Sequence, residues 1–324
     1  MTQILIPPFF PPTGASTSSQ DKPYFPIVMR LLRIVAVLIK TYYSLLITEC
    51  EIFLSLLVKF LDGDKPTWQR ALAIEVLHKL CVQPVLVQSF VECYDMKQHS
   101  TKVFRDIVNA IGTFIQSLFV APPTSPPSNN AGANPSGAGG KNVNAAANDT
   151  AAGNNGNGIS GQGSFAYRGV VMPICVTFSP GTTKAVYLEM MDKTENPTVI
   201  DGYGIAVAYA CLLDVVKTLH CVIQGEGGVE NGNRKTRFDA EGEGLGGKRK
   251  LPSTPPSILG DVDTDKMHEE MVQSSWCGLL AALSFLLDAS TEEAVTESIL
   301  KSLQIFASMA GHLKLTVPRD AFVS

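Results

Sequence analysis

Charged residues are scarce in this chain, and their scarcity limits the partners it can have. Asp, Glu, Lys and Arg make up 17% of its 324 residues, against about 25% in an average soluble protein. The formal net charge is -4, so the chain lacks the strong positive field with which proteins attract nucleic acid. Nucleic acid is therefore not an expected partner.

The short motifs that mark most catalytic and metal sites are also missing. The five histidines are far apart in sequence, and none stands in a His-x-x-x-His pattern. The glycine-rich runs GAGGK and GEGLGGK lack the spacing of a phosphate-binding loop, and no G-x-S-x-G occurs. We therefore predict no catalytic residue, no metal site and no cofactor, and we expect that the protein is not an enzyme.

Cysteine pairs are absent as well. The seven cysteines are scattered among apolar residues and form no C-x-x-C pair. Buried free thiols in a reducing compartment explain this pattern better than a disulfide framework does. The sequence therefore favours a cytosolic location.

Uninterrupted hydrophobic runs of membrane length are missing from the most apolar part of the chain. The start, MTQILIPPFFPP, has no basic region and is broken by prolines, so it does not fit a signal peptide. Further on, charged residues break every run before it reaches the roughly 18–20 apolar residues of a membrane span. The interrupting residues are Arg30, Arg33, Lys40, Glu49, Glu51 and Lys59. We therefore expect no transmembrane helix.

What the sequence does contain is a series of apolar helices with short breaks. In residues 22–120 apolar side chains recur at helical spacing. The helix that begins at Pro26 is apolar almost all round, which predicts that it lies inside a layered structure and not on its surface. Asp64 with Pro66 in the first turn, Pro84, and Ser100 are candidate helix starts. Helices of this kind bury their faces against neighbours. The predicted fold is all-α, a fragment of a HEAT- or armadillo-like helical solenoid with long disordered inserts.

Composition divides the chain into six parts. Segments rich in Pro, Ser, Gly, Asn or charged residues are predicted to be disordered; they are residues 1–21, 121–164 and 225–262. Parts with apolar periodicity are predicted to fold. These are the helical repeat region 22–120, a mostly helical segment 165–224, and a helical hairpin with a tail at 263–324.

The segment between the two inserts carries mixed signals. Residues 170–178 are β-branched and apolar, which fits either a short strand or an extended segment. Residues 182–192 are a candidate helix. Residues 203–223 are a stronger candidate, because their apolar side chains follow one helical face.

Two more helices are predicted at the end of the chain. One begins near Thr264. In the next, Ser290 and Glu293 form a capping-box pattern and Gly311 is the expected C′ residue. The chain then stops without an element that closes the array. Because arrays carry polar capping repeats at their ends, this favours a fragment or an alternative product of a longer protein.

Long strings in the predicted folded parts resemble one protein family. They are KPYFPIVMRLLRIVAVLIK, TECEIFLSLLVKFLDGDKP, YDMKQHSTKVFRDIVNAIG, TKAVYLEMMDK and WCGLLAALSFLLDASTEEA. These strings resemble the Mon-two (monensin-sensitivity) family of Golgi and endosome trafficking scaffolds. That family is similar in its N-terminal half to the large Sec-seven-type Arf exchange factors, but it lacks their catalytic exchange domain.

The resemblance implies a non-enzymatic scaffold in endosome-to-Golgi vesicle-mediated protein transport. It implies a cytoplasmic protein that is peripheral on trans-Golgi network and early endosome membranes. The implied partners are a Dopey-family protein, Arf-like small GTPases and a phospholipid flippase, and homo-oligomer formation is left open.

The resemblance also indicates a candidate partner-binding segment. The exchange factors carry a short box of Asn, an aromatic residue, Asp and Cys, and its counterpart here agrees only at Tyr94 and Asp95. With Lys97, Lys102 and Arg105, these residues are expected to be exposed at a loop and a helix start. The alternative is that Asp95 only caps the next turn.

Two other functions stay open at this point. Kinship with the exchange factors allows a regulator of Arf-family nucleotide exchange. The basic run Lys248-Arg249-Lys250 allows a nuclear transport adaptor built on the same kind of solenoid.

Overall fold

The computed structural model describes residues 24–119, 163–174, 185–225 and 263–324. Its α-helices are Phe25–Tyr42 (α2), Ile47–Lys59 (α3), Thr67–Cys81 (α4), Pro84–Phe90 (α5), Val103–Leu118 (α6), Tyr203–Ile223 (α7), Thr264–Ala289 (α8), Glu293–His312 (α9) and Thr316–Val323 (α10). Shorter elements are Tyr43–Leu45 (η1), the π turn Val91–Asp95 (η2), Tyr187–Glu189 (η3), and the antiparallel strands Ser164–Tyr167 (β1) and Val170–Pro173 (β2). The described residues are mostly helical, in agreement with the predicted all-α class.

Several predictions fall on residues that the structure does not describe. The segment 1–21, nearly all of the two predicted inserts, and the run Lys248-Arg249-Lys250 lie outside the described residues. The domain boundaries drawn at these segments therefore stay predictions.

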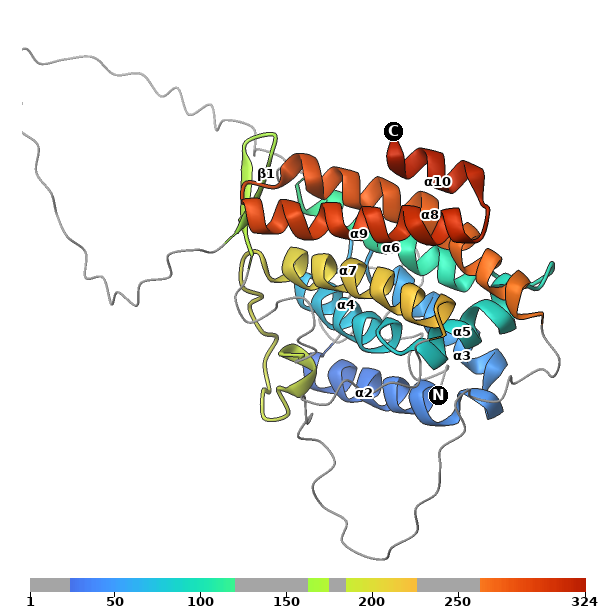
Figure 1. The fold of residues 1–324 in the computed structure, drawn as a ribbon. Coiled ribbons are helices and arrows are strands. Elements are labelled where there is room, and N and C mark those ends of the chain that lie inside the picture. The colour runs from blue at the N-terminus through green and yellow to red at the C-terminus, as the bar shows by residue number, and fades with distance from the viewer. Residues whose placement is uncertain (1–23, 120–162, 175–184, 226–262) are drawn as a thin grey trace, which may run out of the picture.

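The helices lie in two layers (Figure 1). In one layer α2 contacts α4, α4 contacts α7, and α7 contacts α9. In the other, α3 contacts α6, α6 contacts α8, and α8 contacts α10. Helices that are consecutive along the chain also meet across the layers, as α3 does with α4, α6 with α7, and α8 with α9. Helices far apart in sequence, such as α4 and α7, therefore lie side by side.

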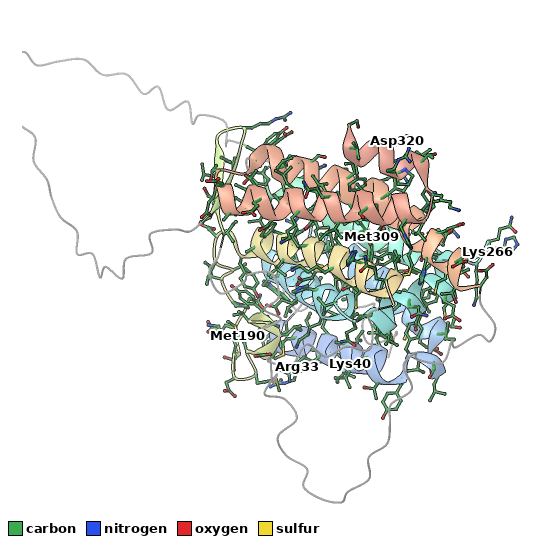
Figure 2. The ribbon with its side chains drawn as sticks, in the orientation of Figure 1. Arg33, Lys40, Met190, Lys266, Met309 and Asp320 are labelled. Atoms are coloured by element: carbon green, nitrogen blue, oxygen red, sulfur yellow. The ribbon has the colours of Figure 1, made fainter. Side chains whose placement is uncertain are left out.

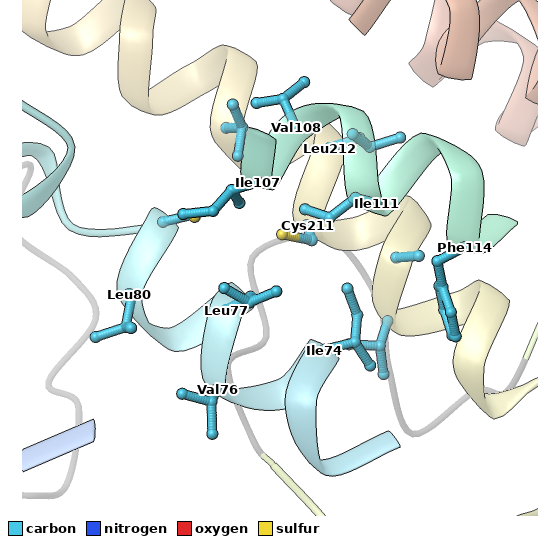
Figure 3. Close-up of a cluster of buried hydrophobic side chains, with 14 of the residues drawn as sticks. Ile74, Val76, Leu77, Leu80, Ile107, Val108, Ile111, Phe114, Cys211 and Leu212 are labelled. Carbon is cyan, nitrogen blue, oxygen red and sulfur yellow. The ribbon is translucent and has the colours of Figure 1, made fainter. Parts of the chain in front are cut away.

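The core lies where α4, α6 and α7 meet. Nearly every residue of α4 is buried, as are most residues of α7, because helices of both layers surround them. Figure 3 shows apolar side chains of the three helices converging; they include Ile74 and Leu77 of α4, Ile107 and Ile111 of α6, and Cys211 and Leu212 of α7. The helix that the sequence predicts to be apolar almost all round and buried is α2 instead, and that prediction is wrong in part, because α2 lies at the edge of its layer and exposes Ile34 and Val37.

Among the described residues, two helices are by length and composition apolar enough to cross a membrane, so the expectation that every apolar run is too short is wrong for them. They are α7 and α8, and a third candidate arises if α4 and the bent continuation Pro84–Asp95 count as one span. The most apolar window of α7 is 78% buried inside the protein. Packing against α4, α6, α8 and α9 thus accounts for the hydropathy of α7.

Helix starts differ in detail from the sequence signals. Asp64 does not cap α4; its carboxylate pairs with Lys65 at 2.7 Å, and the helix begins at Thr67 behind Pro66. Ser100 does not cap α6 either, since that helix begins at Val103 and takes its cap from elsewhere, as described below. The sequence thus predicts where these two helices begin to within about one turn, but it does not predict which side chains cap them.

The capping box predicted for α9 is not formed. The hydroxyl of Ser290 lies 3.3 Å from the carbonyl oxygen of Glu292 and 2.9 Å from the hydroxyl of Thr296, and α9 has no side-chain cap. Gly311 lies within α9, and Lys314 instead adopts the left-handed backbone conformation with φ of 58°. The helix α10 then follows, at the place where a tail was predicted.

The segment between the inserts is less helical than predicted. Of the two possibilities for residues 170–178, a short strand or an extended segment, the structure has a strand at Val170–Pro173 (β2), paired with β1, and residues 175–178 lie outside the described residues. Of the helix expected at 182–192, the described residues contain only the short η3. The helix expected at 203–223 is present with those bounds as α7.

Candidate functional site

The predicted binding segment lies where α5 runs into η2 and then turns into α6. Tyr94 is 1% exposed and Asp95 is fully buried. Lys97 and Arg105 are exposed, and Lys102 is half-buried. The expectation that all five residues form an exposed surface is therefore wrong for Tyr94 and Asp95.

Asp95 is buried because its carboxylate caps α6. It accepts hydrogen bonds from the backbone nitrogen of Phe104 at 2.9 Å and of Arg105 at 3.1 Å. These N–H groups belong to the first turn of α6 and have no partner within the helix. Burial raises the pKa of Asp95 above its ordinary value, although the two N–H donors act in the opposite direction. The alternative interpretation, that Asp95 has a capping role, is thus confirmed.

Tyr94 is buried because it joins three elements. Its hydroxyl donates to the carbonyl oxygen of Ile47, at the start of α3, across 2.6 Å. Its ring lies edge-on to that of Tyr43, with 6.1 Å between ring centroids, and Tyr43 in turn contacts Phe90 of α5. Tyr94 therefore holds α3, η1 and α5 together.

Lys102 closes the turn between η2 and α6. Its ammonium group donates to the carbonyl oxygens of Asp95 and Lys97. Arg105 lies 3.7 Å from Asp106, but both side chains are about half exposed, so this ion pair contributes little to stability. Of the five predicted residues, Lys97 and Arg105 present their charged groups to solvent.

A second cluster, which the sequence did not indicate, surrounds Glu75 of α4. One carboxylate oxygen accepts hydrogen bonds from the backbone nitrogens of Val186 and Tyr187, each at 2.9 Å, and from the hydroxyl of Tyr203. The other accepts from the backbone nitrogen of Leu188 at 2.8 Å. Burial raises the pKa of Glu75, and the four donors act against that effect. The carboxylate ties η3 and α7 to α4.

A third cluster joins α4 and α7 through His78 and Asp214. Nε2 of His78 lies 3.0 Å from Asp214, and Nζ of Lys217 lies 3.1 Å from the other oxygen of that carboxylate. Burial disfavours the charge on Asp214, but His78 and Lys217 outweigh it and lower the pKa of Asp214. His78 is 1% exposed, so it is part of the buried contact between the two helices. The pair spans 136 positions, so no local spacing could have indicated it.

The chemistry of these clusters is structural. The Glu75 and Asp95 carboxylates each accept backbone N–H groups, which holds one element against another. Among the described residues, no group of three or more His, Cys, Asp or Glu side chains is placed to hold a metal ion. The six cysteines in these ranges are free thiols; four are buried, Cys221 is half-buried and Cys277 is exposed.

Comparisons with known proteins identify relatives over almost the whole chain. Residues 15–103 match a model of the Mon2/Sec7/BIG1-like HUS domain family. The chain is 52% identical to a human MON2 homolog over 96% of its own length, and 50% identical to one from Xenopus laevis over the same share. A MON2 homolog from Drosophila melanogaster is 40% identical over 97% of the chain. No solved structure matches.

The chain spans 16–18% of the length of these three relatives. Half or more of its residues are shared with two vertebrate MON2 homologs across the aligned region, and part of that region also matches a family model that joins Mon2 with Sec7. The chain is therefore related, over almost its whole length, to one part of the MON2 homologs.

Proposed function

We propose that this chain is part of a non-enzymatic scaffold that organises proteins of Golgi and endosome trafficking. The observation that carries the proposal is the similarity of the chain to MON2 homologs, together with the match of residues 15–103 to a family model that groups Mon2 with Sec7 and BIG1. The proposed route is endosome-to-Golgi transport, on the cytosolic faces of trans-Golgi network and early endosome membranes. Proposed partners are a Dopey-family protein, Arf-like small GTPases and a phospholipid flippase.

A HEAT- or armadillo-like solenoid is the proposed architecture of this scaffold. The order of helix contacts supports it: α2, α4, α7 and α9 follow one another in one layer, and α3, α6, α8 and α10 follow in the other. In a stack of this kind each repeat contacts only the repeats next to it, so the array presents a long surface. A long rigid surface suits a protein that holds several partners.

Lys97 and Arg105 are the proposed contact residues at the start of α6. Both are exposed, whereas Tyr94 and Asp95 hold the fold together. Changing the two buried residues would therefore unfold the segment and would not test binding. Reversing the charge of Lys97 and Arg105 leaves the capping and ring contacts in place.

The test is recovery of bound proteins from cytosol, with and without added Golgi membranes, on the tagged chain. We expect trafficking proteins of the Golgi and endosomes to be enriched, and recovery of at least one to fall about tenfold with Lys97→Glu and Arg105→Glu together. Lys301→Glu is the matched control, because Lys301 is an exposed cation on α9. If no trafficking protein is enriched over an unrelated helical protein, the scaffold proposal fails.

Regulation of Arf-family nucleotide exchange is the second candidate, and the Sec7 and BIG1 names of the family model favour it. A nucleotide-release assay with an Arf-type GTPase separates the two. Under the scaffold proposal the chain leaves the release rate unchanged. Acceleration in proportion to chain concentration would replace the proposal with an exchange activity.

A further inference from the structure

Residues 187–200 form a closed loop on the surface, which we call the latch loop. The hydroxyl of Tyr187 accepts a hydrogen bond from the backbone nitrogen of Ile200 at 3.1 Å and donates one to the carbonyl oxygen of Thr198 at 3.4 Å. These bonds join the two ends of the loop across 13 and 11 positions. A surface loop of about 6–16 residues whose ends are in contact is an Ω-loop, a type that is often functional.

The base of the latch loop, where its two ends meet, is fixed to the core. Backbone N–H groups at 186–188 donate to the buried carboxylate of Glu75 on α4. The ring of Tyr187 lies edge-on to that of Tyr203 on α7, with 4.9 Å between ring centroids, and both residues are 1% exposed. Moving the base would therefore uncover two buried rings and leave a buried carboxylate without its donors.

The tip of the latch loop, residues 189–196, is exposed instead. Met190 is half-buried, and the remaining side chains of the tip are exposed. Segments that bury few apolar side chains, and whose hydrogen bonds face solvent, open locally at a lower free-energy cost than the core does. The tip is therefore able to move while the base stays in place.

The tip supplies a cap to α2. Oδ1 of Asn196 accepts a hydrogen bond from the backbone nitrogen of Phe25, the first residue of that helix, at 3.2 Å. This N–H belongs to the first-turn groups that have no partner inside a helix, and the N-cap residue Tyr24 makes no side-chain cap bond. The cap thus comes from 171 positions farther along the chain. When the tip opens, the first turn of α2 loses this cap.

Two arginines of α2 bind the latch loop from the helix side. Arg33 donates to the carbonyl oxygen of Leu188 at 2.8 Å, and Arg30 donates to that of Met191 at 3.4 Å. Figure 2 shows Arg33 of α2 beside Met190 of the tip. Hydrogen bonds with a charged donor are stronger than those between neutral groups, so the arginines favour the closed position.

Charge at longer range also favours the closed position. The charged side chains of the tip are all exposed, and with three acids and one lysine they sum to -2; they are Glu189, Asp192, Lys193 and Glu195. The helix α2 carries three cations and no acidic residue. Attraction between exposed charges reaches about 10 Å at 0.1 M salt and about 3 Å at 1 M. Added salt should therefore weaken the hold of α2 on the tip.

We propose that the tip of the latch loop opens and closes over the start of α2 while the base stays fixed, and that charge holds it closed. In the closed state the tip caps α2 and binds its two arginines. In the open state the first turn of α2 is uncapped and both guanidinium groups turn to solvent. The latch thus sets how firmly the start of α2 is attached to the rest of the protein. It is a property of this chain alone, so it stands or falls independently of the proposed scaffold function.

The experiment follows trypsin cleavage after Lys193 in the whole chain. Lys193 is the one Lys or Arg of residues 187–200, and a protease cuts there only while the tip is open, so the rate reports the open population. Initial rates are measured by mass spectrometry and divided by the rate for a synthetic peptide of residues 187–200, which removes the effect of salt on trypsin itself. We expect this relative rate to rise about fivefold between about 0.1 M and about 1 M salt.

Variants on both sides of the contact test the link between the tip and α2. Asn196→Ala and Arg33→Gln should each speed cleavage after Lys193 about fivefold or more, with the reference peptide carrying the same change where it applies. Asn196→Ala should also speed hydrogen–deuterium exchange in the first turn of α2. Arg30→Gln with Arg33→Gln should remove the salt dependence. Lys40→Gln is the matched control, because Lys40 is an exposed cation near the other end of α2, and it should leave the rate unchanged.

Several outcomes would overturn the proposal. Cleavage after Lys193 as slow as cleavage after Arg70 in buried α4 would make the tip part of the core, and a rate equal to that of the free peptide would mean that the tip never closes. A rate that salt leaves unchanged would remove the role of charge. Faster cleavage in Asn196→Ala without faster exchange in α2 would break the link between the two. Circular dichroism melts establish that each variant is folded, and if one is not, the salt dependence of the wild type still tests the latch.

Discussion

Single buried carboxylates hold this protein's elements together. Glu75 is 1% exposed and accepts three backbone N–H groups of the 186–188 turn and the hydroxyl of Tyr203. A buried carboxylate is tolerated when its hydrogen-bonding capacity is filled in this way. It is costly when donors and acceptors no longer match.

Glu75→Gln is expected to lower the free energy of unfolding by about 2–4 kcal/mol. The amide keeps one acceptor oxygen, but its N–H₂ group must face other donors. In one orientation it faces the backbone N–H of Leu188, and in the other it faces those of Val186 and Tyr187. Urea unfolding followed by circular dichroism measures the change. Glu297→Gln, at an exposed position of α9, is the control and should be neutral. An unchanged midpoint for Glu75→Gln would show that the carboxylate does not organise the turn.

The buried carboxyl group of Asp95 makes the stability of the folded protein depend on pH. Its pKa is raised in the folded state by burial, and Glu270 of α8 adds to the rise, so the folded protein keeps this proton to higher pH than the unfolded chain does. The resulting stabilisation is complete below the unfolded pKa of about 3.9. It is lost as the pH rises through the folded pKa.

We therefore expect the stability of the wild type, relative to Asp95→Asn, to fall as the pH is raised above about 4 and then to level off. Urea unfolding at steps from about pH 4 to pH 8 measures it. Asp320→Asn, at an exposed position of α10, should show no comparable fall. A difference that grows with pH would mean that Asp95 is stabilised as an anion.

At the scale of elements, α6 and α8 cross closely because small residues face each other. A Cβ atom added to Gly278 of α8 would lie 2.5 Å from the amide oxygen of Asn109 and 3.0 Å from Val108 on α6. A Cβ on Gly112 of α6 would lie 3.4 Å from Ala282. By contrast, a Cβ on Gly311 of α9 would meet Arg319 at an ordinary 3.6 Å.

Gly278→Ala and Gly311→Ala form a matched pair, because both glycines lie within α-helices and alanine raises helix propensity by up to about 1 kcal/mol at each. We expect Gly311→Ala to be neutral or stabilising. Gly278→Ala should cost about 1–3 kcal/mol, because the Asn109 side chain must turn away and Val108, at 3.0 Å, and the backbone nitrogen of Asn109, at 3.3 Å, must shift. Thermal melts of the two variants measure the difference, and we expect the lower melting temperature for Gly278→Ala. Equal melting temperatures would contradict the close crossing of α6 and α8.

The elements themselves were predictable where the signals are local. Pro84 and the apolar periodicity of 203–223 gave α5 and α7 their bounds. The site was not predictable in the same way. The cap of α6 comes from Asp95, nine residues before the first N–H that it accepts, and Glu75 organises a turn 111 positions away. Such partners meet only after the helices pack, so Tyr94 and Asp95 look like exposed loop residues in sequence.

At the scale of the whole molecule, the N-terminal and later helices depend on each other. Along one layer α4 contacts α7, and along the other α6 contacts α8. At the edge, Phe119 lies 6.1 Å from Tyr167 and 5.4 Å from Phe285, measured between ring centroids. The predicted insert between these parts, 121–164, lies almost entirely outside the described residues, so its disorder stays a prediction.

Limited proteolysis with an unspecific protease tests that prediction. We expect the first cuts at the two predicted inserts, since chains of that composition cannot build a core. The cleaved pieces should still elute together on size exclusion, at the volume of the uncut chain, and separate in denaturant. First cuts inside α4 or α7, or pieces that separate in native buffer, would contradict it.

The pairing of α4 with α7 also has a consequence for synthesis. Roughly 120 residues separate the end of α4 from the start of α7, and a ribosome adding about 5–20 residues per second needs about 6–24 s to make them. During that interval the apolar face of α4 that packs against α7 in the folded protein has no helix to cover it. The nascent chain therefore depends on chaperones, or on slow collapse, until the later helix emerges.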